Sequence, residues 1–216
     1  MMRDSIDRRF FIKTGAILGA SSVLTGSARA AELKATPPET EGPFYPTVAQ
    51  KDKDFDLTKV AGRDGVAKGT AIIVEGSVVD TNGKPVEDVT VDLWQANAAG
   101  RYAHPHDKNP APLDPDFQGW AIVQSGKKGG FRFKTIIPGA YKVSGRWSRP
   151  PHIHFKISKR GYKELTTQMY FPGEPLNDKD RLLGRMSKDE QAQLISEKVE
   201  GEELDTYRFR IVIAEV

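Results

Sequence analysis

The chain has no cysteine, only four histidines and no long hydrophobic run. Without cysteine there is no disulfide framework, so folding must depend on core packing or on a bound metal. The most apolar stretch of the N-terminal region, residues 14–26, is rich in Gly and Ser and is shorter than the roughly 20 residues that cross a bilayer. The sequence therefore argues against a disulfide-linked module and against a membrane-spanning helix.

The chain also has little net charge once its N-terminal region is set aside. Of its 32 basic and 29 acidic residues, five basic and two acidic residues lie in residues 1–30, so residues 31–216 hold 27 of each. The sequence pI of about 9.0 thus belongs mostly to the N-terminal region. A neutral remainder gives no reason to expect nucleic acid as a partner.

Residues 1–30 differ in character from the rest of the chain and predict an export signal. The adjacent Arg8 and Arg9 precede the apolar run, and Ala28-Arg29-Ala30 is a small-x-small cleavage site. This order is typical of a twin-arginine signal peptide, with a membrane anchor as the weaker alternative. We expect a protein that is periplasmic or secreted, keeps no stable membrane anchor after cleavage, and acquires any cofactor while folding in the cytoplasm.

The remaining length fits one globular unit, with an N-terminal arm at residues 31–69 and a β domain at residues 70–216. Short Val/Ile-rich or alternating segments separated by turns predict an all-β sandwich or barrel. The expected strands are residues 71–80, 89–95, 120–124, 131–136, 152–158, 166–171 and 207–214. One C-terminal helix is expected at residues 188–198, capped by Ser187 with Glu190 three residues on. Residues 97–116 form a long loop with four prolines, and loops of this length are often functional.

The segment Arg-Pro-Pro-His-Ile-His-Phe, residues 149–155, carries the clearest chemical signal. In a strand, alternate side chains point to the same face, so His152 and His154 would project together while Ile153 turns into the core. A single metal ion could then draw both imidazoles together. Two polar residues on the wet face of a strand would give the same pattern, so the pair alone does not decide the matter.

Two tyrosines close to glycines favour the metal site over the wet strand face. Tyr102 follows Gly100-Arg101 and Tyr141 follows Gly139-Ala140. Phenolate is a hard anionic donor that favours a hard, highly charged ion, so two tyrosinates with two histidines point to Fe(III). A free phenol has a pKa near 10, so the ion must hold it deprotonated. Each tyrosine alone would more simply be a half-buried sheet residue.

Five motifs in this order resemble the intradiol ring-cleavage dioxygenases, especially the protocatechuate 3,4-dioxygenase type. They are Thr-Glu-Gly-Pro-Phe-Tyr-Pro at 40–46, Leu-Trp-Gln-Ala-Asn-Ala-Ala-Gly-Arg-Tyr at 93–102, Ala-Pro-Leu-Asp-Pro-Asp-Phe-Gln-Gly at 111–119, the 149–155 segment and Thr-Gln-Met-Tyr-Phe at 167–171. The resemblance covers roughly residues 40–176.

The resemblance implies an intradiol-dioxygenase or transthyretin-like β-sandwich with long active-site loops and a non-haem Fe(III). Its ligands would be Tyr102, Tyr141, His152 and His154, with a hydroxide or water as the fifth. Tyr141 matches the axial tyrosine that is displaced when a catechol binds through both oxygens and gives up its protons. With O2 the ring would open between the hydroxylated carbons to a cis,cis-muconate-type diacid.

The resemblance also implies roles around the ring. Arg149 matches a catalytic arginine that would stabilise negative charge on the substrate, and Gln168 matches a glutamine on the oxygen side. Thr40 and Pro43 match the segment that borders the substrate. The second pair, His104 and His106, is interrupted by a proline in a loop, so mouth residues or solvent-exposed ones are expected there.

The sequence departs from the protocatechuate type after the axial tyrosine. That type commonly has Pro-Trp at this point, whereas Tyr141 is followed by Lys142 and Val143. The pocket wall must differ, so the resemblance leaves the catechol unidentified; Lys142 could favour an anionic or bulkier ring. The assembly is also open, either a homo-oligomer or a pairing with a homologous chain. Two alternatives remain: a catalytically weak member that binds metal or aromatic ligands, and a transthyretin-like interaction module.

Overall fold

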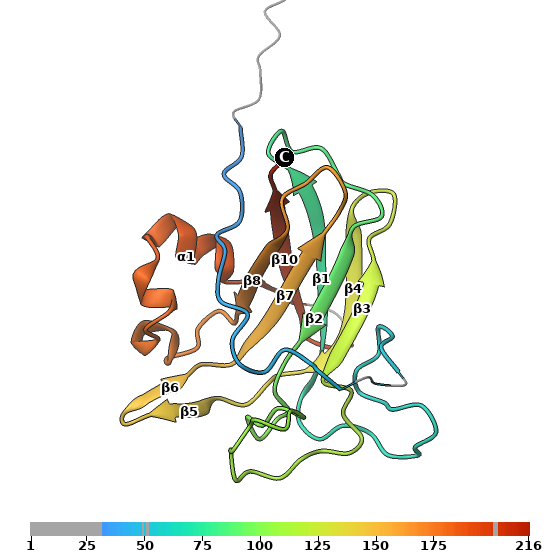
Figure 1. The fold of residues 1–216 in the computed structure, drawn as a ribbon, viewed down its shortest axis with the longest axis vertical. Helices are drawn as coiled ribbons and strands as arrows, with labels where there is room; N and C mark the ends of the chain where they lie inside the picture. Colours follow the sequence, from blue (N-terminus) through green and yellow to red (C-terminus); the bar gives the residue numbers. More distant parts are fainter. Residues whose placement is uncertain (1–31, 49, 51, 201–202) are drawn as a thin grey trace, which may run out of the picture. The chain divides into compact units, whose positions relative to one another are not determined.

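The computed structural model describes residues 32–48, 50, 52–200 and 203–216 (Figure 1). The predicted export signal, residues 1–30, lies outside the described residues. Across the described part of the chain, no helix is both long enough and apolar enough to cross a membrane.

In the described part of the chain, the strands form two four-stranded sheets and a separate hairpin (Figure 1). The first sheet has the order β4 (Gly130–Ile136), β1 (Ala71–Asp80), β10 (Thr206–Ile213) and β9 (Glu197–Val199). The second has the order β3 (Trp120–Gln124), β2 (Thr90–Trp94), β7 (His152–Ser158) and β8 (Leu165–Tyr170). Strands β5 (Tyr141–Ser144) and β6 (Trp147–Arg149) form the hairpin. Two 3-10 turns, η1 (Asn177–Lys179) and η2 (Leu183–Arg185), precede the helix α1 (Lys188–Leu194).

The core lies between the sheets and follows the alternation of the strands. In β10 the inward residues Phe209 and Ile211 are buried, while Arg208 and Arg210, which alternate with them, are exposed. In β7 the inward residues are Ile153, Phe155 and Ile157, all fully buried in the same cluster. Only the β1–β10 pair is parallel among the described strand pairs, and the others are antiparallel. This confirms the predicted all-β sandwich.

The second sheet is buried on both faces, and its outer face positions the site. Trp94, His152, His154, Gln168 and Tyr170 project outward from β2, β7 and β8, yet each is at most 3% exposed. The N-terminal arm covers them: the Glu39 amide donates to the Thr166 carbonyl of edge strand β8 at 2.8 Å. Further along the arm, the Tyr45 hydroxyl donates to Asp92 of β2 at 2.7 Å.

The predicted strands all exist within one residue at each end, and the predicted helix begins where expected. Ser187 and Glu190 form a reciprocal capping box. The helix ends at Leu194 instead of Lys198, so that part of the prediction was wrong. The last residues of the predicted helix, 197 and 198, instead belong to β9, which pairs with β10. Pairing with a distant strand outweighs the local helical preference there.

Candidate metal and substrate site

Four aromatic rings meet on the outer face of the second sheet, and they are the four predicted ligands. The ring centroids of Tyr102 and Tyr141 are 5.7 Å apart, and those of His152 and His154 are 5.0 Å apart. Tyr141 lies 5.6 Å from His152, and Tyr102 lies 6.2 Å from His154. The histidines come from β7, Tyr141 from β5 and Tyr102 from the long loop after β2. The chain thus brings together residues up to 52 positions apart.

The loop that carries Tyr102 is held by its own polar side chains. Asp107 accepts the Tyr102 amide at 2.7 Å, and Asn97 accepts the amides of Ala99 and Arg101. Gly100 has a φ of 76°, and a Cβ there would collide with the Ala140 carbonyl oxygen. Only glycine fits this contact, which brings the two tyrosine-bearing segments side by side.

The two histidines are presented differently. His152 Nδ1 lies 2.6 Å from the Pro150 carbonyl oxygen, an acceptor, so Nδ1 carries the proton. This leaves the Nε2 lone pair free, 3.5 Å from the Tyr102 hydroxyl. His154 stacks on Trp94 with ring centroids 4.8 Å apart, and its buried Nδ1 has no hydrogen-bond partner among the described residues. A buried imidazole nitrogen without a protein partner is compatible with a ligand bound at this ring.

The four groups are neutral on their own. Burial raises the pKa of Tyr102 well above its ordinary value and also raises the pKa of Tyr141. Burial, reinforced by the positive charge of Arg149, lowers the pKa of His152 well below its usual range and that of His154 to about 3. Two neutral imidazoles have lone pairs to offer, and a cation between the phenols would hold them deprotonated.

The donor set fits a hard metal ion only if the tyrosines are included. Within the described residues, no group of three His, Cys, Asp or Glu side chains gathers closely enough to hold one. Two imidazoles need further donors, and the two phenols are the groups beside them. Phenolate oxygen with imidazole nitrogen suits Fe(III). The arrangement therefore fits the group predicted from the sequence, while the assignment of each residue as a ligand stays a prediction.

Arg149 lies beside the rings in a buried network. Its Nε is 3.2 Å from Asp180 Oδ1, and the two side chains are 4% and 0% exposed. Its Nη2 donates to Gln168 Oε1 at 2.7 Å and to the Tyr170 hydroxyl at 2.9 Å. Tyr170 in turn donates to Glu39 Oε2 at 2.9 Å. The guanidinium is thus held in one orientation from three sides.

A cavity of about 650 Å³ opens onto this cluster. Tyr141, His154 and Arg149 line it, together with Thr40 and Pro43 of the arm. The remaining lining residues are Gly42, Phe44, His106, Asp107, Lys108, Asn109, Pro110, Lys142, Val143, Ser144, Trp147 and Leu182. Tyr102 and His152 are not among them, so a ligand reaches only one tyrosine and one histidine directly.

Gln168 lies behind Arg149 and does not line the cavity. Its Oε1 accepts from Arg149 and its Nε2 donates to the Thr40 carbonyl at 2.9 Å. Both ends of the amide are therefore used to tie the arm to the arginine. The catalytic role expected for Gln168 stays a prediction. Its contacts in the structure are those of a residue that orients Arg149.

The second histidine pair lies toward the outside. His106 is exposed and lines the cavity, whereas the half-exposed His104 packs against Phe44, with ring centroids 5.8 Å apart. His104 Nε2 is 3.5 Å from the Thr47 hydroxyl, a contact at the limit of a hydrogen bond. These positions agree with residues at the mouth and beside the site.

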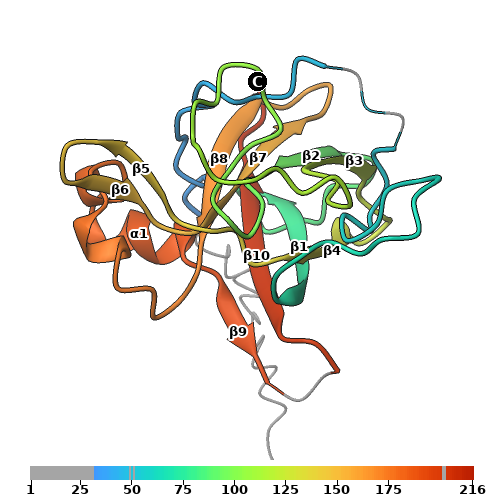
Figure 2. The same ribbon diagram turned by 90° about the horizontal axis from the view of Figure 1, so that it is seen from below.

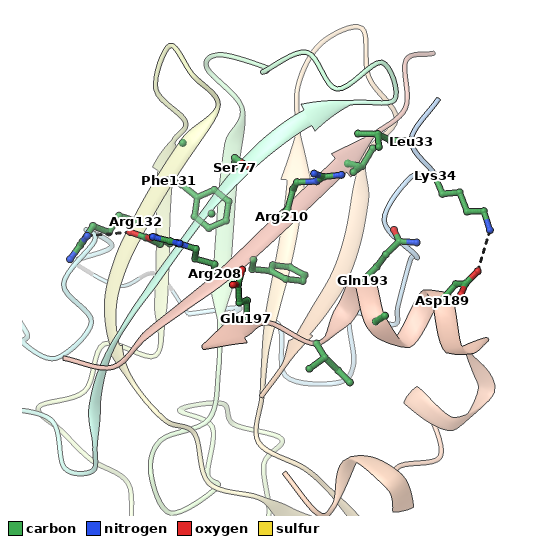
Figure 3. A pocket seen from close by; sticks show the side chains of 17 residues that line it. Leu33, Lys34, Ser77, Phe131, Arg132, Asp189, Gln193, Glu197, Arg208 and Arg210 are labelled. Carbon is green, nitrogen blue, oxygen red and sulfur yellow. Dashed lines mark hydrogen bonds and ion pairs between the residues drawn. The ribbon is translucent and has the colours of Figure 1, made fainter. Parts of the chain in front are cut away.

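A larger hollow of about 1080 Å³ lies elsewhere, on the outer face of the first sheet (Figure 3). Glu75 bridges Arg132 and Arg208 there, with N–O distances of 3.3 and 2.8 Å. Lys34 and Asp189 face each other at its edge (Figure 3). This hollow contains neither a histidine nor a tyrosine, so we place the chemistry in the smaller cavity.

Several residues of this site were not among those predicted from the sequence. Asp180, Tyr170 and Glu39 hold Arg149, and Trp94 stacks on His154. Trp94 had a signal, because it lies on the outward face of an alternating strand. Asp180 comes from the irregular segment between η1 and η2 and had none.

Comparison with known proteins agrees with this geometry. The model of a dioxygenase family matches residues 40–215. A protocatechuate 3,4-dioxygenase beta chain from Burkholderia cepacia is 41% identical over 186 residues, covering 78% of this chain and 79% of the relative. A chlorocatechol 1,2-dioxygenase from Cupriavidus pinatubonensis is 32% identical over 170 residues, covering 71% of this chain and 60% of the relative.

Solved structures give the same answer. The dioxygenase domain of a dioxygenase carbohydrate-binding protein fusion from Streptomyces sp. SirexAA-E aligns with a TM-score of 0.65 at 27% identity, covering 85% of this chain and 100% of that one. A 3-chlorocatechol 1,2-dioxygenase from Rhodococcus opacus 1CP aligns with a TM-score of 0.67 at 26% identity, covering 85% and 74%. Fold and matches together define a dioxygenase. More narrowly, the chain belongs to the intradiol dioxygenase family, which confirms the resemblance seen in the sequence.

Proposed function

We propose that the protein is a non-haem Fe(III) enzyme that cleaves a catecholic ring between its two hydroxylated carbons with O2, giving a cis,cis-muconate-type diacid. This proposal depends on one observation: the rings of Tyr102, Tyr141, His152 and His154 lie together at a cavity that Arg149 also lines. The relatives are named as dioxygenases of protocatechuate and chlorocatechol, which supports a catechol as the substrate class.

Tyr102, Tyr141, His152 and His154 would hold the iron. When bound, Fe(III) supplies the Lewis acidity that keeps phenols and catechols deprotonated. It also makes the catechol ring reactive toward O2. The protein contributes a buried, water-poor setting, since Tyr102 and both histidines are at most 3% exposed. Because burial raises the pKa of both tyrosines, the protein alone would leave them protonated.

Each cavity residue has a task that its position allows. Tyr141 lines the cavity, so its phenolate oxygen can take a proton from an entering catechol. Arg149 is fixed by Asp180 and Gln168 and can stabilise negative charge on the ring without reorganising. Thr40 and Pro43 border the same space and limit where the ring can lie.

An oxygen electrode with a panel of catechols tests this function. Iron-loaded protein should consume O2 with at least one of catechol, protocatechuate or hydroxyquinol and yield the ring-opened diacid, while His152→Ala should not. Cleavage beside the two hydroxylated carbons, or a lack of uptake with every catechol by protein of full iron content, would refute it. The latter result would favour the catalytically weak member of the same fold.

We also propose twin-arginine export and an assembled state. Export is supported by the Arg8-Arg9 motif and the Ala28-Arg29-Ala30 site. Replacing both arginines with lysine should trap uncleaved protein in the cytoplasm, whereas efficient export of that variant would contradict the pathway. For assembly, the naming of one relative as a beta chain supports a partner chain or a second copy. Light scattering of the purified protein would reveal a monomer if this is wrong.

A further inference from the structure

We propose that the substrate is a catechol whose side chain ends in a carboxylate, with the ring at the four-ring cluster and the carboxylate at a subsite formed by Lys108 and Lys142. This inference rests on the proposed function, because it assumes that the catechol ring binds beside Tyr141 and Arg149. It goes further by assigning a second binding point and a substrate class. The size of the cavity, its lining and its unbalanced charge carry it.

The cavity is larger than a bare catechol requires. At about 650 Å³ it falls in the range of about 300–1,000 Å³ that pockets for drug-sized ligands occupy. Part of its lining is apolar. This part is formed by Phe44, Pro110, Val143, Trp147 and Leu182. A single ring with two hydroxyls would leave this apolar surface in contact with water, whereas a substituent on the ring would cover it.

The two lysines reach the cavity from separate walls. Lys142 is on β5, directly after Tyr141, and Lys108 is in the long loop that carries Tyr102. Figure 2 shows the β5–β6 hairpin projecting from the sandwich on the side where α1 lies. Both lysine side chains are exposed, and neither makes an ion pair with another described residue.

The lining of the cavity holds more cationic side chains than carboxylates. Asp107 is the one acidic residue among those that line it. Its Oδ2 accepts the Tyr102 amide at 2.7 Å and its Oδ1 accepts the Asn109 amide at 2.8 Å, so both oxygens serve the loop. Arg149, the third cation of the cavity, is already paired with Asp180. The lining therefore carries a net positive charge, to which both Lys108 and Lys142 contribute.

Matched pairs of ligands test the subsite. 3,4-Dihydroxyphenylpropanoate and its methyl ester share the ring and the spacer and differ in charge. The acid should have the higher kcat/KM, by about two- to fivefold for each lysine, the range that exposed ion pairs allow. The preference should weaken at high salt. Lys108→Met and Lys142→Met should each lower the acid-to-ester ratio, and the double variant should bring it close to one.

Lys128→Met is the matched control, because Lys128 is exposed in the turn between β3 and β4 and does not line the cavity. Its acid-to-ester ratio should stay at the wild-type value. An equal kcat/KM for acid and ester, a ratio unchanged in the double variant, or a higher kcat/KM for unsubstituted catechol than for the acid would overturn the proposal.

Anaerobic calorimetric titration separates this inference from the proposed function. Without O2 no ring is cleaved, so the affinities for acid and ester can be compared directly, and the lysine variants should again reduce the difference. If no catechol supports O2 uptake but the acid still binds more tightly than the ester, the function fails and the subsite stands. Equal affinities for acid and ester alongside normal turnover of catechol would sink the subsite alone.

Discussion

Asp180 and Arg149 form a fully buried ion pair, 3.2 Å apart, although they are 31 residues apart in the chain. Asp180 also accepts the Trp147 indole N–H at 3.1 Å, so one carboxylate fixes both the cavity arginine and an adjacent wall residue. A buried pair contributes little net stability over an apolar pair of the same size, but removing one partner leaves a charge without compensation. The pair is therefore a means of holding Arg149 in place.

The first prediction concerns this pair. Asp180→Asn should lower the free energy of unfolding by about 3 kcal/mol or more, as expected when one partner of a buried ion pair is neutralised. It should also reduce kcat, because Arg149 loses its fixed orientation, while iron content changes little. Chemical denaturation and steady-state kinetics measure both. Asp178→Asn, on the exposed surface of η1, is the control. Wild-type kcat in Asp180→Asn would show that the pair does not position Arg149.

Arg149 itself gives a second prediction. Arg149→Ala should lower kcat by about 10²- to 10³-fold, the typical loss when one fixed charge-stabilising donor is removed, and should leave most of the iron bound. Arg149→Lys should recover little, because an ammonium cannot reproduce the contacts of the guanidinium with Asp180 and Gln168. Arg146→Ala in the exposed hairpin turn serves as the control. If the iron content and kcat of Arg149→Ala fell by the same factor, Arg149 would have a structural role instead.

The unequal positions of the two tyrosines give a third prediction. Tyr141 lines the cavity while Tyr102 is buried behind it. Tyr141→Phe should keep most of the iron and slow substrate deprotonation, reducing kcat by about 10²-fold, the lower range for loss of a positioned base. Stopped-flow spectra of catechol binding would show the slowed step. Turnover at the wild-type rate would refute the part assigned to Tyr141.

The histidines give a fourth. His152→Ala or His154→Ala should weaken iron binding by more than about 100-fold, since loss of even an outer partner of a ligand costs about 10- to 100-fold. The other imidazole pair of the described chain, His104 and His106, lies toward the mouth, where His104 packs against Phe44. His104→Ala is the control, because His104 packs on Phe44 at the side of the site. Elemental analysis measures the iron, and a full complement in either β7 variant would overturn the ligand assignment.

Much of the fold and the inner site could be predicted because their signals are local. Alternation in residues 152–158 and 207–214 predicts which side chains enter the core, and Ile153 does so between the two histidines. The four predicted ligands stand in short motifs that can be recognised in the sequence. The capping box at Ser187 is equally local, which explains why the start of α1 is correct.

The parts that could not be predicted depend on distant contacts. Residues 197 and 198 end the predicted helix but belong to β9, which pairs with β10, a contact that no local signal reports. Asp180 is separated from Arg149 along the chain by β7, β8 and η1, so no local signal reports their contact. The β5–β6 hairpin is short and mostly exposed, so its residues show no apolar alternation.

The central claim is that two tyrosinates and two histidines hold Fe(III), and the visible absorption spectrum of the purified protein, measured beside its iron content, tests it most directly. The account predicts a red-brown protein with a tyrosinate-to-Fe(III) charge-transfer band that shifts when catechol is added anaerobically and weakens in Tyr102→Phe. A protein with one iron per chain and no such band, or a band of unchanged position and intensity in Tyr102→Phe, would contradict it.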